Sequence, residues 1–104
     1  LLLRKGAHID AQDENNDSAL HWASRKGHTQ VAKLLIDSGA DIHLQGPGKQ
    51  TPLIIAAAKG QMEIVSLLLE KGGHINVQDE NNDSALHWAS RKGHIQVVKI
   101  LVDS

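Results

Sequence analysis

The sequence contains no cysteine, no phenylalanine and no tyrosine. Without cysteine the chain forms neither disulfides nor thiolate metal sites. This fits an intracellular protein, and we expect the cytoplasm, with the nucleus as the alternative location. Two tryptophans are the only aromatic residues, so the core has to be built from Leu, Ile, Val and Ala.

Strong net charge and long apolar runs are also missing. The net charge is −1, so no long-range field attracts nucleic acid or an anionic membrane. A membrane-spanning helix needs about 18 or more apolar residues in a row, and no such run is present. We therefore expect neither nucleic-acid binding nor membrane insertion. The chain begins without methionine, and we expect it to be a segment of a longer protein.

What the sequence does contain is a repeat. The segment 17–28 returns unchanged as 83–94, which is 66 residues later, and a related segment, 51–60, stands halfway between them. The middle segment begins Thr-Pro-Leu, and the outer two continue as Leu-His-Trp-Ala. A period of 33 residues with a Thr-Pro-Leu-His-x-Ala start is the signature of ankyrin repeats. The whole chain resembles that family.

The resemblance implies an all-α solenoid of stacked antiparallel helix pairs with β-turn finger loops. The chain 1–104 then forms one domain. It divides into the end of a leading repeat (1–12), two full repeats (13–45 and 46–78) and a repeat without its closing loop (79–104). In the family each finger is a β-hairpin with glycine at the fourth repeat position. Asn16 and Asn82 stand there, and asparagine tolerates left-handed backbone better than other residues with a side chain.

Cap residues predict where the helices of the first repeat begin and end. Ser18 is a good N-cap, and His21 three residues later completes a capping box in which imidazole replaces Glu. A helix over 19–26 should end at Gly27. A second helix over 29–38 should follow, and its apolar residues at i, i+3 and i+4 predict one buried face. Those residues are Val31, Leu34 and Leu35. Leu1–Lys5 is predicted to be the last turn of a preceding helix.

The middle repeat has different turn chemistry. Gly46–Lys49 places Pro at i+1 and Gly at i+2, which a type II turn requires. Thr51 should cap the next helix, with Pro52 in its first position. Its partner helix is predicted over 62–71. We expect its inward side chains to be Ile64, Leu67 and Leu68.

Seven histidines raise the question of a metal or catalytic site. His21 and His28 are not spaced i, i+4 as in a helical zinc site. His8, His43 and His74 fall one per loop, so they need not converge. Asp17, Ser18 and His21 are the residue types of a catalytic triad, but they occupy consecutive cap positions on one turn. We predict no enzyme activity, no cofactor and no metal.

Protein binding is the function that the resemblance implies. In the family, finger tips and first-helix ends line a concave surface that grips other proteins. The corresponding positions are Glu14, Asn15, Asp17, Arg25 and Lys26; Pro47, Gly48, Gln50, Ala58 and Lys59; and Glu80, Asn81, Asp83, Arg91 and Lys92. Trp22 and Trp88 stand where the family has an aliphatic residue. They are either packing residues or binding anchors.

Two alternatives to a dedicated binding surface remain open, and a separate expectation concerns the ends of the chain. The charges on this face could instead pair with one another. The near-identity of the outer repeats also fits a structural spacer within a longer array, natural or engineered. The apolar ends of the chain could stack head to tail between molecules.

Asn76 is a separate candidate site. The resemblance implies hydroxylation of an asparagine eight positions after a leucine, and Asn76 follows Leu68 by eight.

Overall fold

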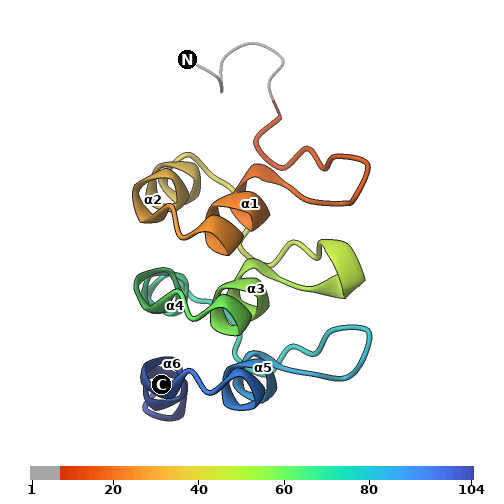
Figure 1. Ribbon diagram of the computed structural model, residues 1–104. Helices are drawn as coiled ribbons and strands as arrows, with labels where there is room; N and C mark the ends of the chain where they lie inside the picture. The colour runs from red at the N-terminus through yellow and green to blue at the C-terminus, as the bar shows by residue number, and fades with distance from the viewer. Residues whose placement is uncertain (1–7) are drawn as a thin grey trace.

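The computed structural model describes residues 8–104, and in them three helix pairs stack in one direction (Figure 1). The helices are α1 (Ala19–Lys26), α2 (Thr29–Asp37), α3 (Pro52–Lys59), α4 (Met62–Glu70), α5 (Ala85–Lys92) and α6 (Ile95–Val102), with a short 3₁₀ turn, η1 (Pro47–Lys49). α1, α3 and α5 form one column, and α2, α4 and α6 form the other. The all-α solenoid predicted from the sequence is confirmed.

The helix ends of the first repeat follow the predicted caps. Ser18 accepts a hydrogen bond from the backbone N–H of His21, and the His21 ring accepts one from the N–H of Ser18, so the capping box is complete. Gly27 ends α1 in the left-handed conformation, with φ 75°. α2 ends one residue earlier than predicted, at Asp37.

The loops before α1, α3 and α5 are turns, and in each a backbone bond joins the first residue to the fifth. Asp13 N–H donates to Asp17 O (2.9 Å), and the same bond recurs 33 and 66 residues later. Asn16 and Asn82 take left-handed φ values of 69° and 65°, as predicted. Gly48 and the following Lys49 are also left-handed, with φ values of 63° and 62°, within the 3₁₀ turn η1. No β-strand forms within residues 8–104, so the fingers are turns without the strands of a hairpin.

The core is aliphatic and runs along the stack. Leu20, Leu53 and Ile64 are among its buried members. One prediction was wrong: Val31 and Leu34 are 47% and 58% exposed, whereas Leu35 is buried. The repeat equivalent of Val31 in α4 is Ile64, which is fully buried because the first helix pair lies above it. Helix periodicity alone did not reveal that this side needs a preceding repeat to be covered.

The remaining expectations concern the first residues of the chain, the buried side of α4 and membrane insertion. The predicted helical turn at Leu1–Lys5 lies outside the described residues. In α4, Leu67 is only half-buried, although Ile64 and Leu68 point fully inward as predicted. Within residues 8–104, no helix combines the length and the apolar character needed to cross a membrane.

Candidate interaction face

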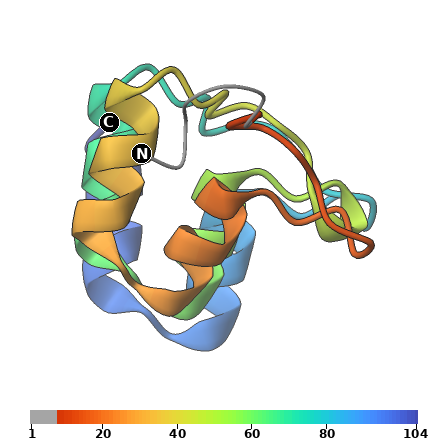
Figure 2. The same cartoon turned by 90° about the horizontal axis from the view of Figure 1, so that it is seen from above.

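The three finger loops project from the same side of the stack (Figure 2). The loops consist of residues 13–17, 46–50 and 79–83, and α1, α3 and α5 lie between them and the second helices (Figure 1). We use the term finger face for these loops together with the last turns of α1, α3 and α5. The predicted binding residues all fall on these segments or on the exposed sides of α1 and α5.

Trp22 and Trp88 are anchored at the base of the fingers. Trp22 is 41% exposed, and its Nε1–H donates to Asp13 Oδ2 at 3.1 Å. Trp88, which is half-buried, donates in the same way to Asp79 Oδ2 at 2.8 Å. Both rings are therefore held in one orientation and still present a surface to solvent. The packing and binding interpretations of these tryptophans are compatible.

Asp13 and Asp79 were not singled out in the sequence, yet they organise the fingers. Asp13 Oδ1 accepts the N–H groups of Asn15 and Asp17. The bond from Trp22 and these backbone bonds lower the pKa of Asp13. At Asp79 burial raises the pKa, but the bonds from Trp88, the backbone and Gln50 outweigh it and the pKa is lowered. The Asp-x-Asn sequence, which favours such a turn, was the available signal.

The arginines of the finger face are already paired within the chain. Arg25 Nη2 lies 2.8 Å from Asp17 Oδ1, and Arg91 Nη2 lies 2.9 Å from Asp83 Oδ1. The Asp83 bond raises the pKa of Arg91. Each guanidinium also lies over the neighbouring tryptophan ring, at 4.8 Å for Arg25. For these four charged residues, mutual pairing accounts for the charge pattern.

The lysines of the same turns are exposed. Lys26, Lys59 and Lys92 lie 33 residues apart, one at the end of each first helix. Lys26 Nζ is 5.8 Å from the centre of the Trp22 ring, and Lys92 is equally far from Trp88. Lys59 has no such neighbour, because Ile55 takes the tryptophan position and is buried. The three ammonium groups give the finger face a basic edge.

The tips of the first and third fingers are exposed to solvent, whereas the tip of the middle finger is partly buried. Glu14, Asn15, Glu80 and Asn81 are exposed. In the middle finger Pro47, Gly48 and Gln50 are half-buried. Gly48 O accepts the N–H of Glu80, and Gln50 Nε2 donates to Asp79. The carbonyl oxygen of Ala58 likewise accepts a hydrogen bond from Nε2 of His94. The middle finger thus contacts the next finger and presents less surface.

Two loop features lie away from the finger face. The rings of His43 and His74 stack with centroids 4.2 Å apart, a proximity that the one-per-loop spacing did not reveal. No group of three potential metal ligands occurs among residues 8–104. Asn76 is exposed in the loop that follows α4.

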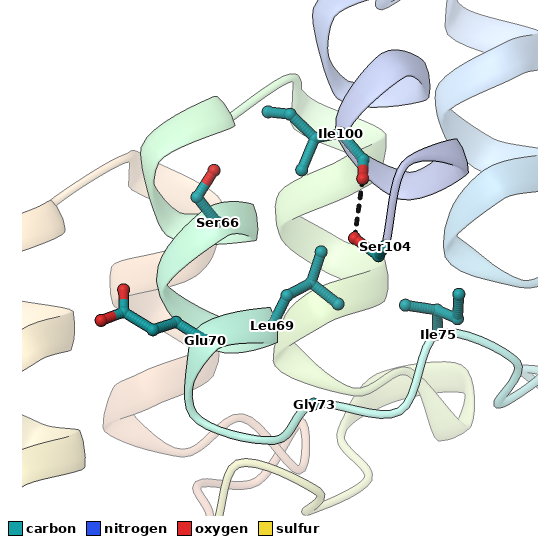
Figure 3. Close-up of a pocket in the computed structure, with 7 residues that line it drawn as sticks. All are labelled: Ser66, Leu69, Glu70, Gly73, Ile75, Ile100 and Ser104. Carbon is teal, nitrogen blue, oxygen red and sulfur yellow. Dashed lines mark hydrogen bonds between the residues drawn. The ribbon is translucent and has the colours of Figure 1, made fainter.

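One surface hollow carries none of the predicted residues. It lies between the ends of α4 and α6, on the side of the second helices (Figure 3). Ser66, Leu69, Glu70, Gly73, Ile75, Ile100 and Ser104 line it. Glu70 is the one ionisable side chain among them, and it points away from Ile100 and Ser104. This lining offers apolar contact without a set of catalytic groups.

Comparison with protein families agrees with the repeat pattern. Residues 38–104 match the family described as ankyrin repeats (3 copies), and residues 15–47 match the single ankyrin repeat. The two matches together reach from the first finger to the last residue. No curated protein matches the chain.

Proposed function

Since the chain belongs to the ankyrin-repeat family, whose members generally mediate protein–protein interaction and are typically non-catalytic, we propose that it binds another protein through the finger face. The observation that carries the proposal is the spacing of the exposed lysines. Lys26, Lys59 and Lys92 recur once per repeat on one edge, without a salt bridge to any residue in 8–104. A partner segment with acidic side chains at matching intervals would complement them.

The tryptophans add apolar contact to this charge pattern. An indole ring that is held in place binds with little loss of conformational entropy, which is why tryptophan dominates many interfaces. Trp22 and Trp88 are two repeats apart, with buried Ile55 between them. We infer that a partner contacts the outer repeats through the rings and the middle repeat through Lys59.

The pairing of Arg25 and Arg91 changes how this proposal should be tested. Reversing their charge would break the bonds to Asp17 and Asp83, so lost binding could reflect a disturbed finger. The exposed lysines avoid that ambiguity. Lys26→Glu with Lys92→Glu changes the finger face. Lys33→Glu with Lys99→Glu makes the same change in charge on exposed positions of α2 and α6, in the same two repeats.

The experiment is affinity capture from cell extract on the immobilised chain, followed by titration of each captured protein. A finger-face partner should bind the Lys33/Lys99 variant as tightly as the original chain and the Lys26/Lys92 variant at least tenfold more weakly. Raising the salt concentration should weaken the same interaction, because exposed charges are screened. Equal losses in both variants would contradict the finger face as the binding site.

A structural spacer is the second candidate, and one observation favours it. Segments 12–38 and 78–104 differ at only four of 27 positions, all in the second helices, so their finger-face residues are the same. Contact positions usually diverge when each repeat reads a different part of a partner. If no captured protein distinguishes the two lysine variants, the spacer function is supported instead.

We also propose Asn76 as a hydroxylation site. Its exposure in a loop eight residues after Leu68 supports access by a modifying enzyme. Peptide mass spectrometry of the chain isolated from cells should find one added oxygen at Asn76. An unmodified peptide, with Asn76→Ala as the control for site assignment, would contradict this proposal.

A further inference from the structure

Two histidines from successive repeats meet on the surface of the molecule. His43 belongs to the loop after α2, and His74 belongs to the loop after α4. Seen along the stack, the first of these loops overlies the second (Figure 2), and the two imidazole rings stack with their centroids 4.2 Å apart. Both residues are exposed to solvent. The pair lies away from the finger face, so the proposed binding of a protein partner does not use it.

The backbone beside each histidine is held in place by the rest of the fold. Ile42, directly before His43, and Ile75, directly after His74, both pack against the hydrophobic core. The N–H of His43 also donates to Oδ1 of Asp41 at 2.9 Å. The two side chains are therefore brought together before any ligand binds, which reduces the entropy lost when a ligand orders them.

The turn before His74 is anchored as well. The N–H of Gly73 donates to the carbonyl oxygen of Leu68 at 2.8 Å, and a Cβ at Gly73 would lie 2.9 Å from that oxygen. The absence of a side chain at Gly73 thus lets the loop pass close to the end of α4. This close approach fixes where the chain leaves the helix and where His74 begins the next loop.

The equivalent junction one repeat earlier has no histidine pair. Asp10 stands at the position of His43, and Asp41 stands at the position of His74. There the two loops are joined by a hydrogen bond from the N–H of Asp41 to Oδ1 of Asp10, at 2.9 Å. The fold therefore does not require two imidazoles where successive loops meet, and the pair of His43 and His74 is a feature of one junction.

The separation of the two rings is close to the one that a shared metal ion requires. Imidazole is a preferred ligand of Zn²⁺, Ni²⁺ and Cu²⁺. Two imidazoles that bind one zinc ion, each through a nitrogen at about 2.0–2.1 Å, have ring centres about 5 Å apart. The observed 4.2 Å is about 1 Å short of this separation. Because both side chains are exposed, rotations about their own bonds can open the stack and aim one nitrogen of each ring at the same ion.

We propose that His43 and His74 bind a divalent transition-metal ion such as Zn²⁺, with one imidazole from each of two successive repeats. No group of three potential ligands occurs among residues 8–104, so water or a side chain from another molecule completes the coordination. Asp41 adds a negative charge on the same turn, which favours a cation. The bound ion clips the two loops together. The expectation of no metal rested on the one-per-loop spacing of the histidines, which does not reveal this contact.

Zinc titration of the untagged full chain at pH 7.5, by calorimetry in a buffer that does not bind zinc, tests the site. The pair should bind one ion per chain. His43→Gln and His74→Gln should each weaken this binding about tenfold or more, because a single imidazole cannot chelate the ion. Zinc should also raise the urea denaturation midpoint of the original chain more than that of either variant. Without metal the three midpoints should agree, since both side chains are exposed.

His28→Gln is the matched control, because His28 is exposed and its side chain makes no capping bond. This variant should bind zinc as tightly as the original chain. The double variant of His43 and His74 should bind about as weakly as either single variant, because the first substitution already removes the chelate. If each single variant loses one of two ions at unchanged affinity, the histidines bind separately and the shared site is wrong. Equal weakening in His28→Gln, or no binding of zinc to the original chain, would also overturn it.

Discussion

Helices α1 and α5 have the same eight residues and the same caps, but they differ in what covers them. Leu20 is 1% exposed and its equivalent Leu86 is 40% exposed. His21 is buried with two carbonyl partners, and His87 is exposed. The helix and its cap are thus set by local sequence, whereas burial is set by the neighbouring repeat. This pair of identical helices allows local and tertiary contributions to be measured separately.

The largest expected difference is at the leucines. Leu20→Ala should cost about 3 kcal/mol of unfolding free energy, because it leaves a cavity in a closed site. Leu86→Ala should cost about 1 kcal/mol, because part of that side chain already contacts water. Urea denaturation of both variants is the measurement. Equal costs would show that the two sites are buried alike in solution.

Gly46→Ala should weaken the contact between His21 on α1 and the loop of the middle repeat, and so lower the free energy of unfolding. The added Cβ displaces the His21 ring and weakens its carbonyl bonds, for a combined cost of about 2 kcal/mol. A double-mutant cycle with His21→Ala assigns the cause. In the His21→Ala background the cost of Gly46→Ala should largely disappear. An unchanged cost would place its origin elsewhere in the turn.

Acid should weaken the buried cap of α1. Burial lowers the pKa of His21, although the bonds to Leu44 and Gln50 and the charge of Asp17 oppose this and Arg25 reinforces it. The unfolded chain, with an ordinary histidine pKa of about 6.5, then binds more protons than the folded chain. The stability that the neutral His21 ring contributes is fully present above about pH 6.5, and it is lost as the pH falls toward the lowered pKa of the folded chain.

Unfolding measured from pH 7.5 to 5 for the original chain and for His21→Gln tests this sign. The original chain should lose more stability than the variant over that range, because the variant has no proton to bind at this position. Equal slopes for the two chains would show that His21 folds without a lowered pKa.

The smallest expected difference is at the serine caps. Ser18 and Ser84 accept a hydrogen bond from the third helical N–H at 3.3 and 3.5 Å. Each Ser→Ala variant should cost about 1 kcal/mol, and the two costs should agree, because a cap acts within its own helix. A denaturation midpoint unchanged by Ser18→Ala would contradict the capping assignment.

The features that were predicted correctly from the sequence depend on interactions between residues close together in the chain. The capping boxes, the left-handed Asn16 and Asn82, and the glycine helix ends depend on residues three to five positions apart. The errors concern longer distances. Val31 and Leu34 have the periodicity of a buried face, but their contacts would come from a different repeat.

The candidate site likewise has features that the sequence predicted and contacts that it did not. Repeat spacing located the finger tips and the exposed lysines. It did not reveal that Asp13 holds Trp22 or that Arg25 is paired with Asp17, since these bonds join a loop to a helix eight or nine residues away. It also did not reveal the stacking of His43 on His74, which joins two successive repeats.

The sequence by itself determined the 33-residue period, the six helices with their caps and turns, and the family to which the chain belongs. These follow from backbone and side-chain preferences that act within one or two helical turns. Tertiary structure decided which copy of an identical helix is buried, and which charges are paired and which remain exposed. It also placed the His21 ring in the space that a side chain at Gly46 would occupy. Those outcomes depend on a neighbouring repeat, which a local sequence cannot specify because α1 and α5 read the same.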